Sequence, residues 1–121
     1  MFAAGCAWTN SSDRNAKERF AAVDGGGLLA RLSAVPILTW NYKTQDASIR
    51  HIGPVAQDYR AAFGLGEDDK HIATVDADGV ALAAIQALYK LVLQKDEQIQ
   101  KLAQQLEELR GQVARLQPLS R

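Results

Sequence analysis

The last third of the chain carries a heptad repeat, which constrains the fold more than any other feature. From Ile85 to Leu116, apolar residues recur at alternating three- and four-residue steps, with one gap at Lys95. The residues at the a and d positions are Ile85, Leu88, Val92, Ile99, Leu102, Leu106, Leu109, Val113 and Leu116. A repeat of this length keeps one apolar stripe facing a partner only when helices supercoil around each other. The sequence therefore predicts a long helix that forms a coiled coil, and hence an oligomer.

The number of chains in the coil is less constrained by the heptads. β-Branched residues at a with Leu at d favour two parallel strands, whereas Leu106 at a weakens that preference. Lys95 stands at a d position, where a polar residue sets the register at some loss of stability. The g positions carry uncharged Gln98, Gln105 and Gln112, which favours self-association over ionic selection of a different partner. Taken alone, the heptads favour a dimer over a trimer.

Composition excludes several classes of function. The 121 residues contain 14 Lys plus Arg and 14 Asp plus Glu, so the formal net charge is zero. A neutral chain has no general attraction for nucleic acid or for an anionic membrane. Cys6 is the single cysteine, and no cluster of Cys and His has metal-ligand spacing. We therefore expect no metal, no cofactor, no nucleic acid and no membrane partner.

The chain divides by pattern into four parts. Residues 1–11 form a lead-in or the stub of an upstream chain, and residues 12–84 form a small domain. Residues 85–117 form the coiled-coil helix, and residues 118–121 form a tail. The expected fold class is α+β, in which a small mixed domain of short strands and helices precedes the long helix.

Within residues 12–84, turn residues and periodicity predict the elements. Asp24–Gly27 predicts a turn with positive φ, and a helix follows to Ala34, ended by Pro36. Residues 37–42 and 49–52 are rich in β-branched and aromatic residues and predict a hairpin. A helix begins near Pro54 and ends at Gly64 as its C-cap. A short strand is expected over residues 71–75, followed by a helix that Asp76 or Asp78 caps.

Ser12 and Lys17 place a hydroxyl, a possible nucleophile, and an amine, a possible base, five residues apart. A serine is activated when a neutral lysine accepts its proton, and desolvation or cationic neighbours such as Arg14 and Arg19 favour the neutral amine. Five steps of an α-helix rotate by roughly 140°, which points the two side chains apart. The pair meets only across a bend or between neighbouring chains. The alternative interpretation is an N-cap, Ser12 or Asp13, ahead of a solvated charged helix.

The same stretch resembles a known family, and the resemblance continues through most of residues 12–93. The segments that carry it are Ser12-Asp13-Arg14-Asn15-Ala16-Lys17-Glu18 and residues 38–42, 50–58, 63–66 and 76–88. They are similar to the auto-cleaving intramolecular chaperone domain at the C-termini of phage tailspikes and tail fibres, of the endosialidase type. A related domain occurs in the myelin regulatory transcription factors.

The resemblance implies a parallel homotrimer that aligns three chains of an upstream β-rich fibre and then cuts itself off. By position, Ser12 is the nucleophile and Lys17 is the base of a Ser–Lys dyad. The hydroxyl of Ser12 reaches the preceding carbonyl through a five-membered ring, so we expect cleavage between Ser11 and Ser12, unless it attacks a neighbouring chain. The implied partners are further copies of the chain and an upstream tail fibre or tailspike, in the cytoplasm of a bacterial host during phage assembly.

A second hypothesis requires no chemistry. The chain is then a non-catalytic homo-oligomerisation module, and Ser12 is only a helix cap. A DNA-associated module has little support, because no basic recognition surface is visible in the sequence.

Overall fold

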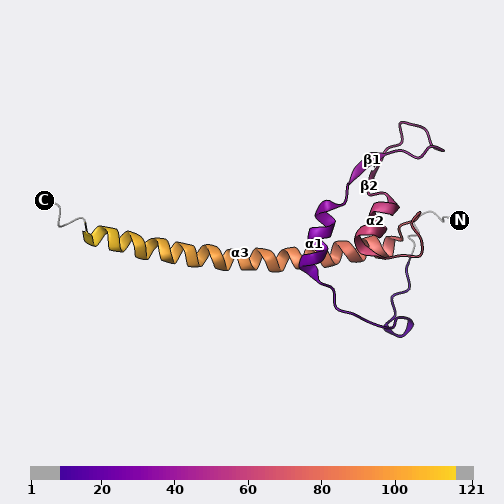
Figure 1. The fold of residues 1–121 in the computed structure, drawn as a ribbon. Helices are drawn as coiled ribbons and strands as arrows, with labels where there is room; N and C mark the ends of the chain where they lie inside the picture. The colour runs from indigo at the N-terminus through magenta and orange to yellow at the C-terminus, as the bar shows by residue number, and fades with distance from the viewer. Residues whose placement is uncertain (1–8, 117–121) are drawn as a thin grey trace. The chain divides into compact units, whose positions relative to one another are not determined.

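The structure is a computed structural model that describes residues 9–116 (Figure 1). Cys6, most of the predicted lead-in 1–11 and the predicted tail 118–121 lie outside the described residues. The chain separates into two compact units, Met1–Ala84 and Ile85–Arg121. The expected α+β class is confirmed, since a two-stranded sheet and short helices precede one long helix. No helix in the described part of the chain is long and apolar enough to cross a membrane.

The first α-helix, α1, runs over Gly25–Ala34 and begins with three glycines. The Asp24 carboxylate caps it by accepting a hydrogen bond of 3.2 Å from the amide of Gly27. A Cβ on Gly27 would lie 2.5 Å from that carboxylate, so a larger residue here would displace the capping side chain. The predicted turn of positive φ over Asp24–Gly27 is wrong, because the capped glycines form the first helical turn instead. Val35 is extended ahead of Pro36 and ends the helix, as predicted.

A short antiparallel hairpin follows, with β1 over Leu38–Trp40 and β2 over His51–Gly53. Thr39 pairs with Ile52 at the centre of the register. The predicted hairpin is confirmed, although both strands are shorter than the sequence pattern suggested. The indole of Trp40 donates to the carbonyl of Gly53 at 3.3 Å, which ties the two strands together beyond the ladder.

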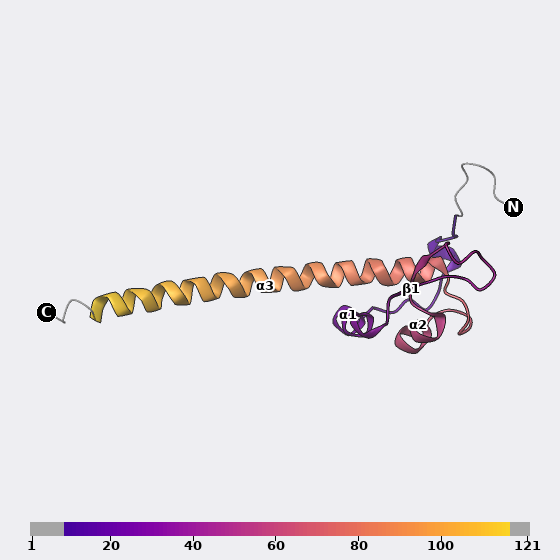
Figure 2. The ribbon, with the colours of Figure 1, turned by 90° about the horizontal axis from the view of Figure 1, so that it is seen from above.

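Helix α2 covers Ala56–Phe63 and lies beside α1 (Figure 2). Val55 precedes it as the N-cap, so Pro54 stands just outside the helix rather than in its first turn. Gly64 closes the helix with φ of 64°, in the left-handed region that glycine adopts without steric cost. The predicted C-cap is therefore confirmed.

Helix α3 spans Thr74–Leu116, so it contains the whole heptad region. The strand predicted over residues 71–75 is wrong, because α3 begins inside that stretch. The amide of Asp76 already donates to the carbonyl of Ala73 at 3.1 Å, which places Asp76 in the first turn of the helix and not at its cap. Asp78 lies further inside the helix, so it is not the cap either.

The core of the first unit is small and joins three helices. Leu28 of α1, Tyr59 of α2, and Val80 and Ala84 of α3 are each less than a tenth exposed. The Tyr59 hydroxyl is buried and has no hydrogen-bond partner among residues 9–116. Burial first, then the charge of Asp76, raises the pKa of Tyr59. This cluster anchors the first turns of α3 to α1 and α2.

Candidate functional site

Residues 12–17 form a tight turn built around one 3₁₀ helix, η1, over Arg14–Ala16. Asp13 caps it, because its carboxylate accepts from the amide of Asn15 at 3.0 Å. The carbonyl of Asp13 accepts from the amide of Ala16, also at 3.0 Å. Asp13 and Lys17 are extended on either side of the turn. This geometry reverses the chain within six residues, as an α-helix over the same stretch would not.

The turn brings together the two side chains that the sequence singled out. The Nζ of Lys17 donates to the Oγ of Ser12 at 2.7 Å. The two residues meet across a bend, which is one of the two arrangements that the rotation argument left open. A neutral amine at this distance is placed to take the hydroxyl proton, which is the contact that a nucleophile and its general base require.

The pair is exposed in the single chain. All residues from Thr9 to Asp24 are exposed, including Ser11 and Ser12 on either side of the predicted scissile bond. A low-dielectric environment favours the neutral form of an amine and strengthens electrostatic contacts. Within residues 9–116, neither Ser12 nor Lys17 lies in such an environment.

The segment that links the turn to α1 contains the one non-glycine residue of positive φ in the described part of the chain. Arg19 has φ of 54°, in a region that non-glycine residues seldom occupy. It lies two residues after Lys17. The backbone therefore changes direction twice between Ser12 and α1, first at η1 and again at Arg19.

The nine predicted seam residues all lie on α3, and none is covered in the single chain. Their exposed fractions run from 46% at Val113 to 68% at Leu116. Removing large aliphatic side chains from water stabilises by about 1.5–3 kcal/mol each. An exposed stripe of this length is therefore a strong driving force for association with other helices.

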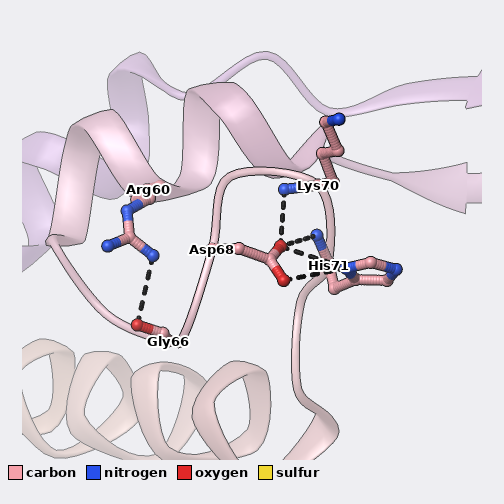
Figure 3. A network of polar contacts seen from close by, with 5 residues as sticks. All are labelled: Arg60, Gly66, Asp68, Lys70 and His71. Atoms are coloured by element: carbon pink, nitrogen blue, oxygen red, sulfur yellow. Dashed lines mark hydrogen bonds and ion pairs between the residues drawn. The ribbon is translucent and has the colours of Figure 1, made fainter.

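A second polar cluster, which the sequence did not point to, lies in the loop ahead of α3 (Figure 3). The Asp68 carboxylate accepts from the amide of Lys70 at 2.8 Å and from the amide of His71 at 3.0 Å. The Nδ1 of His71 lies 3.0 Å from the same carboxylate. The Lys70 amide first, then the His71 ring, lower the pKa of Asp68. Arg60 adds a bond of 3.1 Å to the carbonyl of Gly66 in the same loop.

This cluster has a structural explanation. An Asp side chain that accepts from the backbone amides two and three residues later forms a local turn. The Asp ahead of Lys70 and His71 is the sequence signal from which this turn could have been predicted. His51 is likewise held locally, since its Nε2 lies 2.9 Å from the Oε1 of Gln45 and its ring packs against Trp40 and Tyr42. Over residues 9–116, no three His, Cys, Asp or Glu side chains are grouped as metal ligands.

Comparison with known families places residues 12–64 in a match to a peptidase family described as "Chaperone of endosialidase". The match begins at Ser12, includes η1, α1, the hairpin and α2, and ends at the C-cap Gly64. The resemblance read from the sequence is thus confirmed over these residues, and it supports a chaperone role with peptidase character in general. No curated protein matches the chain.

Proposed function

We propose that this chain is an intramolecular trimerisation chaperone for an upstream tail-fibre or tailspike β-structure, and that it releases itself by autoproteolysis at Ser12. The observation that carries the proposal is the 2.7 Å contact between the Lys17 Nζ and the Ser12 Oγ. It lies at the start of the segment that matches the chaperone family.

The reaction follows from the positions of the groups. Neutral Lys17 accepts the hydroxyl proton while the Ser12 Oγ attacks the carbonyl carbon of Ser11 through a five-membered ring. The C–N bond breaks, and the proton that Lys17 accepted passes to the leaving Ser12 nitrogen. An ester then links the Ser11 carbonyl to the Ser12 Oγ. Water then hydrolyses the ester, which leaves a carboxylate on Ser11 and restores the Ser12 hydroxyl beside a free amine. Water is the only co-reactant.

The coiled coil explains why cleavage would follow assembly. Three parallel helices hold three upstream chains at high local concentration, which lowers the entropy cost of registering a triple-stranded fold. Cleavage afterwards removes the chaperone in the host cytoplasm. The fibre then persists because its unfolding is slow rather than because the chaperone stays attached.

Cleavage is coupled to assembly in this proposal. The Ser12–Lys17 contact forms within one chain, but the pair is exposed there. Covering by neighbouring chains supplies the desolvation that a lysine base requires. The uncut precursor is therefore the expected state of a monomer.

The test is the fate of a tag placed ahead of Met1. Mass spectrometry should find the wild-type chain beginning at Ser12, and the variants Ser12→Ala and Lys17→Ala should each remain intact. Ser11→Ala and Lys43→Ala are matched controls, since each removes the same functional group at an exposed position outside the pair, and both should still be cut. Cleavage that survives Ser12→Ala would overturn the assignment of the nucleophile.

The exposure of the pair and the length of the seam also support a second candidate, a non-catalytic homo-oligomerisation module. In that case the tagged wild-type chain stays intact while forming a stable oligomer. The mass of the oligomer, measured on the same sample, separates the two functions.

A further inference from the structure

Two exposed apolar side chains of α3 lie beside the seam rather than in it. With Ile85 at position a, Leu82 and Tyr89 occupy the e position of consecutive heptads. They are 66% and 63% exposed. The e positions of the later heptads carry polar or small residues, namely Asp96, Ala103 and Arg110. Only the start of the coil therefore presents large apolar residues at the e position.

The geometry of a parallel coil identifies what these residues face. The e position of one helix lies next to the g position of its neighbour, five residues earlier in the sequence. Tyr89 therefore faces Ala84 of the neighbouring copy. Carried back one heptad, ahead of the seam that begins at Ile85, the same register sets Leu82 opposite Ala77. A large apolar residue opposes a small one at both levels, which is the shape match that close packing requires.

Ala84 is already covered in its own chain. It is 8% exposed and Val80 is 6% exposed, and both lie in the core cluster with Leu28 of α1 and Tyr59 of α2. At the level of Ala84, the g side of each helix is thus occupied by the small domain of the same chain, whereas Ala77 is exposed. A Tyr89 side chain that approaches Ala84 of a neighbour meets the small domain of that neighbour.

We propose that Leu82 and Tyr89 form a docking surface for the small domain of a second copy of this chain, at the side where that domain packs on Val80 and Ala84. The contact rests on the parallel self-association proposed above and adds a specific partner surface to it. Each small domain is then held between its own helix and the helix of a neighbour. The turn that carries Ser12 and Lys17 belongs to that domain, so assembly fixes its position as well.

Photo-crosslinking tests the contact directly. A benzophenone amino acid replaces Tyr89 in the full chain bearing Ser12→Ala, and isotopically light and heavy chains are mixed so that crosslinks between copies are recognised. The expected product joins position 89 to residues 25–73 of another copy, which lie outside α3. The same probe at Lys90, an f position that points away from the seam, should give no such product. Crosslinks from position 89 confined to residues 74–116, all of them on α3, or to its own chain, would overturn the contact.

A double variant provides the second measurement. Leu82→Ala with Tyr89→Ala leaves every a and d residue in place, so the oligomer mass should not change. Hydrogen exchange in Gly25–Ala34 and Ala56–Phe63 should become faster, because the small domain loses its second support. Unchanged exchange in an intact oligomer overturns the docking surface alone. A monomeric wild-type chain overturns the proposed assembly itself, so the two failures are distinguishable.

Discussion

The two compact units of the chain differ in where their apolar side chains are buried. Up to Ala84, the chain has a core of its own, in which Leu28, Tyr59, Val80 and Ala84 are each less than a tenth exposed. From Ile85 to Leu116, the nine apolar a and d residues are between 46% and 68% exposed. The first unit is stabilised by contacts within the chain. The second is a helix whose apolar stripe has the heptad spacing of a coiled coil and is exposed in the single chain. The first unit therefore buries its apolar residues within one chain, whereas burial of the apolar residues of the second requires other helices.

The Ser12–Lys17 pair shows the same division on a smaller scale. Its contact of 2.7 Å depends only on the turn at η1, which the Asp13 cap holds within one chain. Its environment is open to solvent. Local sequence thus supplies the geometry of the reaction, and assembly supplies the burial, in our proposal.

The largest effect is expected when the apolar seam of the second unit is disrupted. Ile99→Asp with Leu102→Asp would place two carboxylates per chain at the centre of the seam, where burying unpaired charges costs several kcal/mol. We expect a monomer by sedimentation and complete loss of cleavage of the tagged chain. The control is Gln104→Asp with Ala114→Asp, which adds the same charges at the f and b positions outside the seam. Cleavage by a verified monomer would contradict the coupling of cutting to assembly.

A smaller effect is expected from breaking the core of the first unit. Leu28→Ala removes a buried aliphatic side chain from that core and should destabilise it by about 2–5 kcal/mol. Urea denaturation followed by circular dichroism should show the small domain unfolding early, while the coil keeps its helical signal. Leu28→Met, which keeps the volume, should cost less than about 1.5 kcal/mol. A single transition that shifts as a whole would show that the two units unfold together, which would contradict the expected separate unfolding of the small domain.

The elements that the sequence predicted correctly are those that local chemistry decides. Gly64 ends α2 because a left-handed C-cap needs glycine, and Val35 ends α1 because Pro36 follows. The heptads predicted the long helix because their period is sustained over many turns. The hairpin followed from two β-branched and aromatic runs, although its strands proved shorter.

The elements that the sequence predicted wrongly depend on competition between local signals. Three glycines suggested a turn, but the Asp24 carboxylate on the Gly27 amide starts a helix there. The β-branched residues near Val75 suggested a strand, but the helix that buries Val80 extends back to Thr74. For the Ser12–Lys17 pair, the rotation of an α-helix means that the side chains meet only across a bend or between chains. Which of the two occurs depends on the Asp13 cap of η1, which residue spacing does not reveal.

The smallest effect is expected at the Asp68 turn. Its carboxylate accepts hydrogen bonds from nearby backbone amides, as the Asp13 carboxylate does at η1. Hydrogen bonds from the Lys70 amide first, and from the His71 side chain, hold the pKa of Asp68 below its ordinary value. A lowered folded-state pKa means that the turn contributes its stability above the unfolded value of about 3.9, and loses it as pH falls through the lower folded value. Carboxyl titration by NMR should therefore give a lower midpoint for Asp68 in the folded chain than in the urea-unfolded chain. Equal midpoints would show that the turn does not persist in solution.

Asp68→Asn, which keeps one acceptor oxygen but cannot ionise, should remove this pH dependence of stability. Cleavage at Ser12 should be unchanged, because the two turns lie in separate parts of the small domain's sequence.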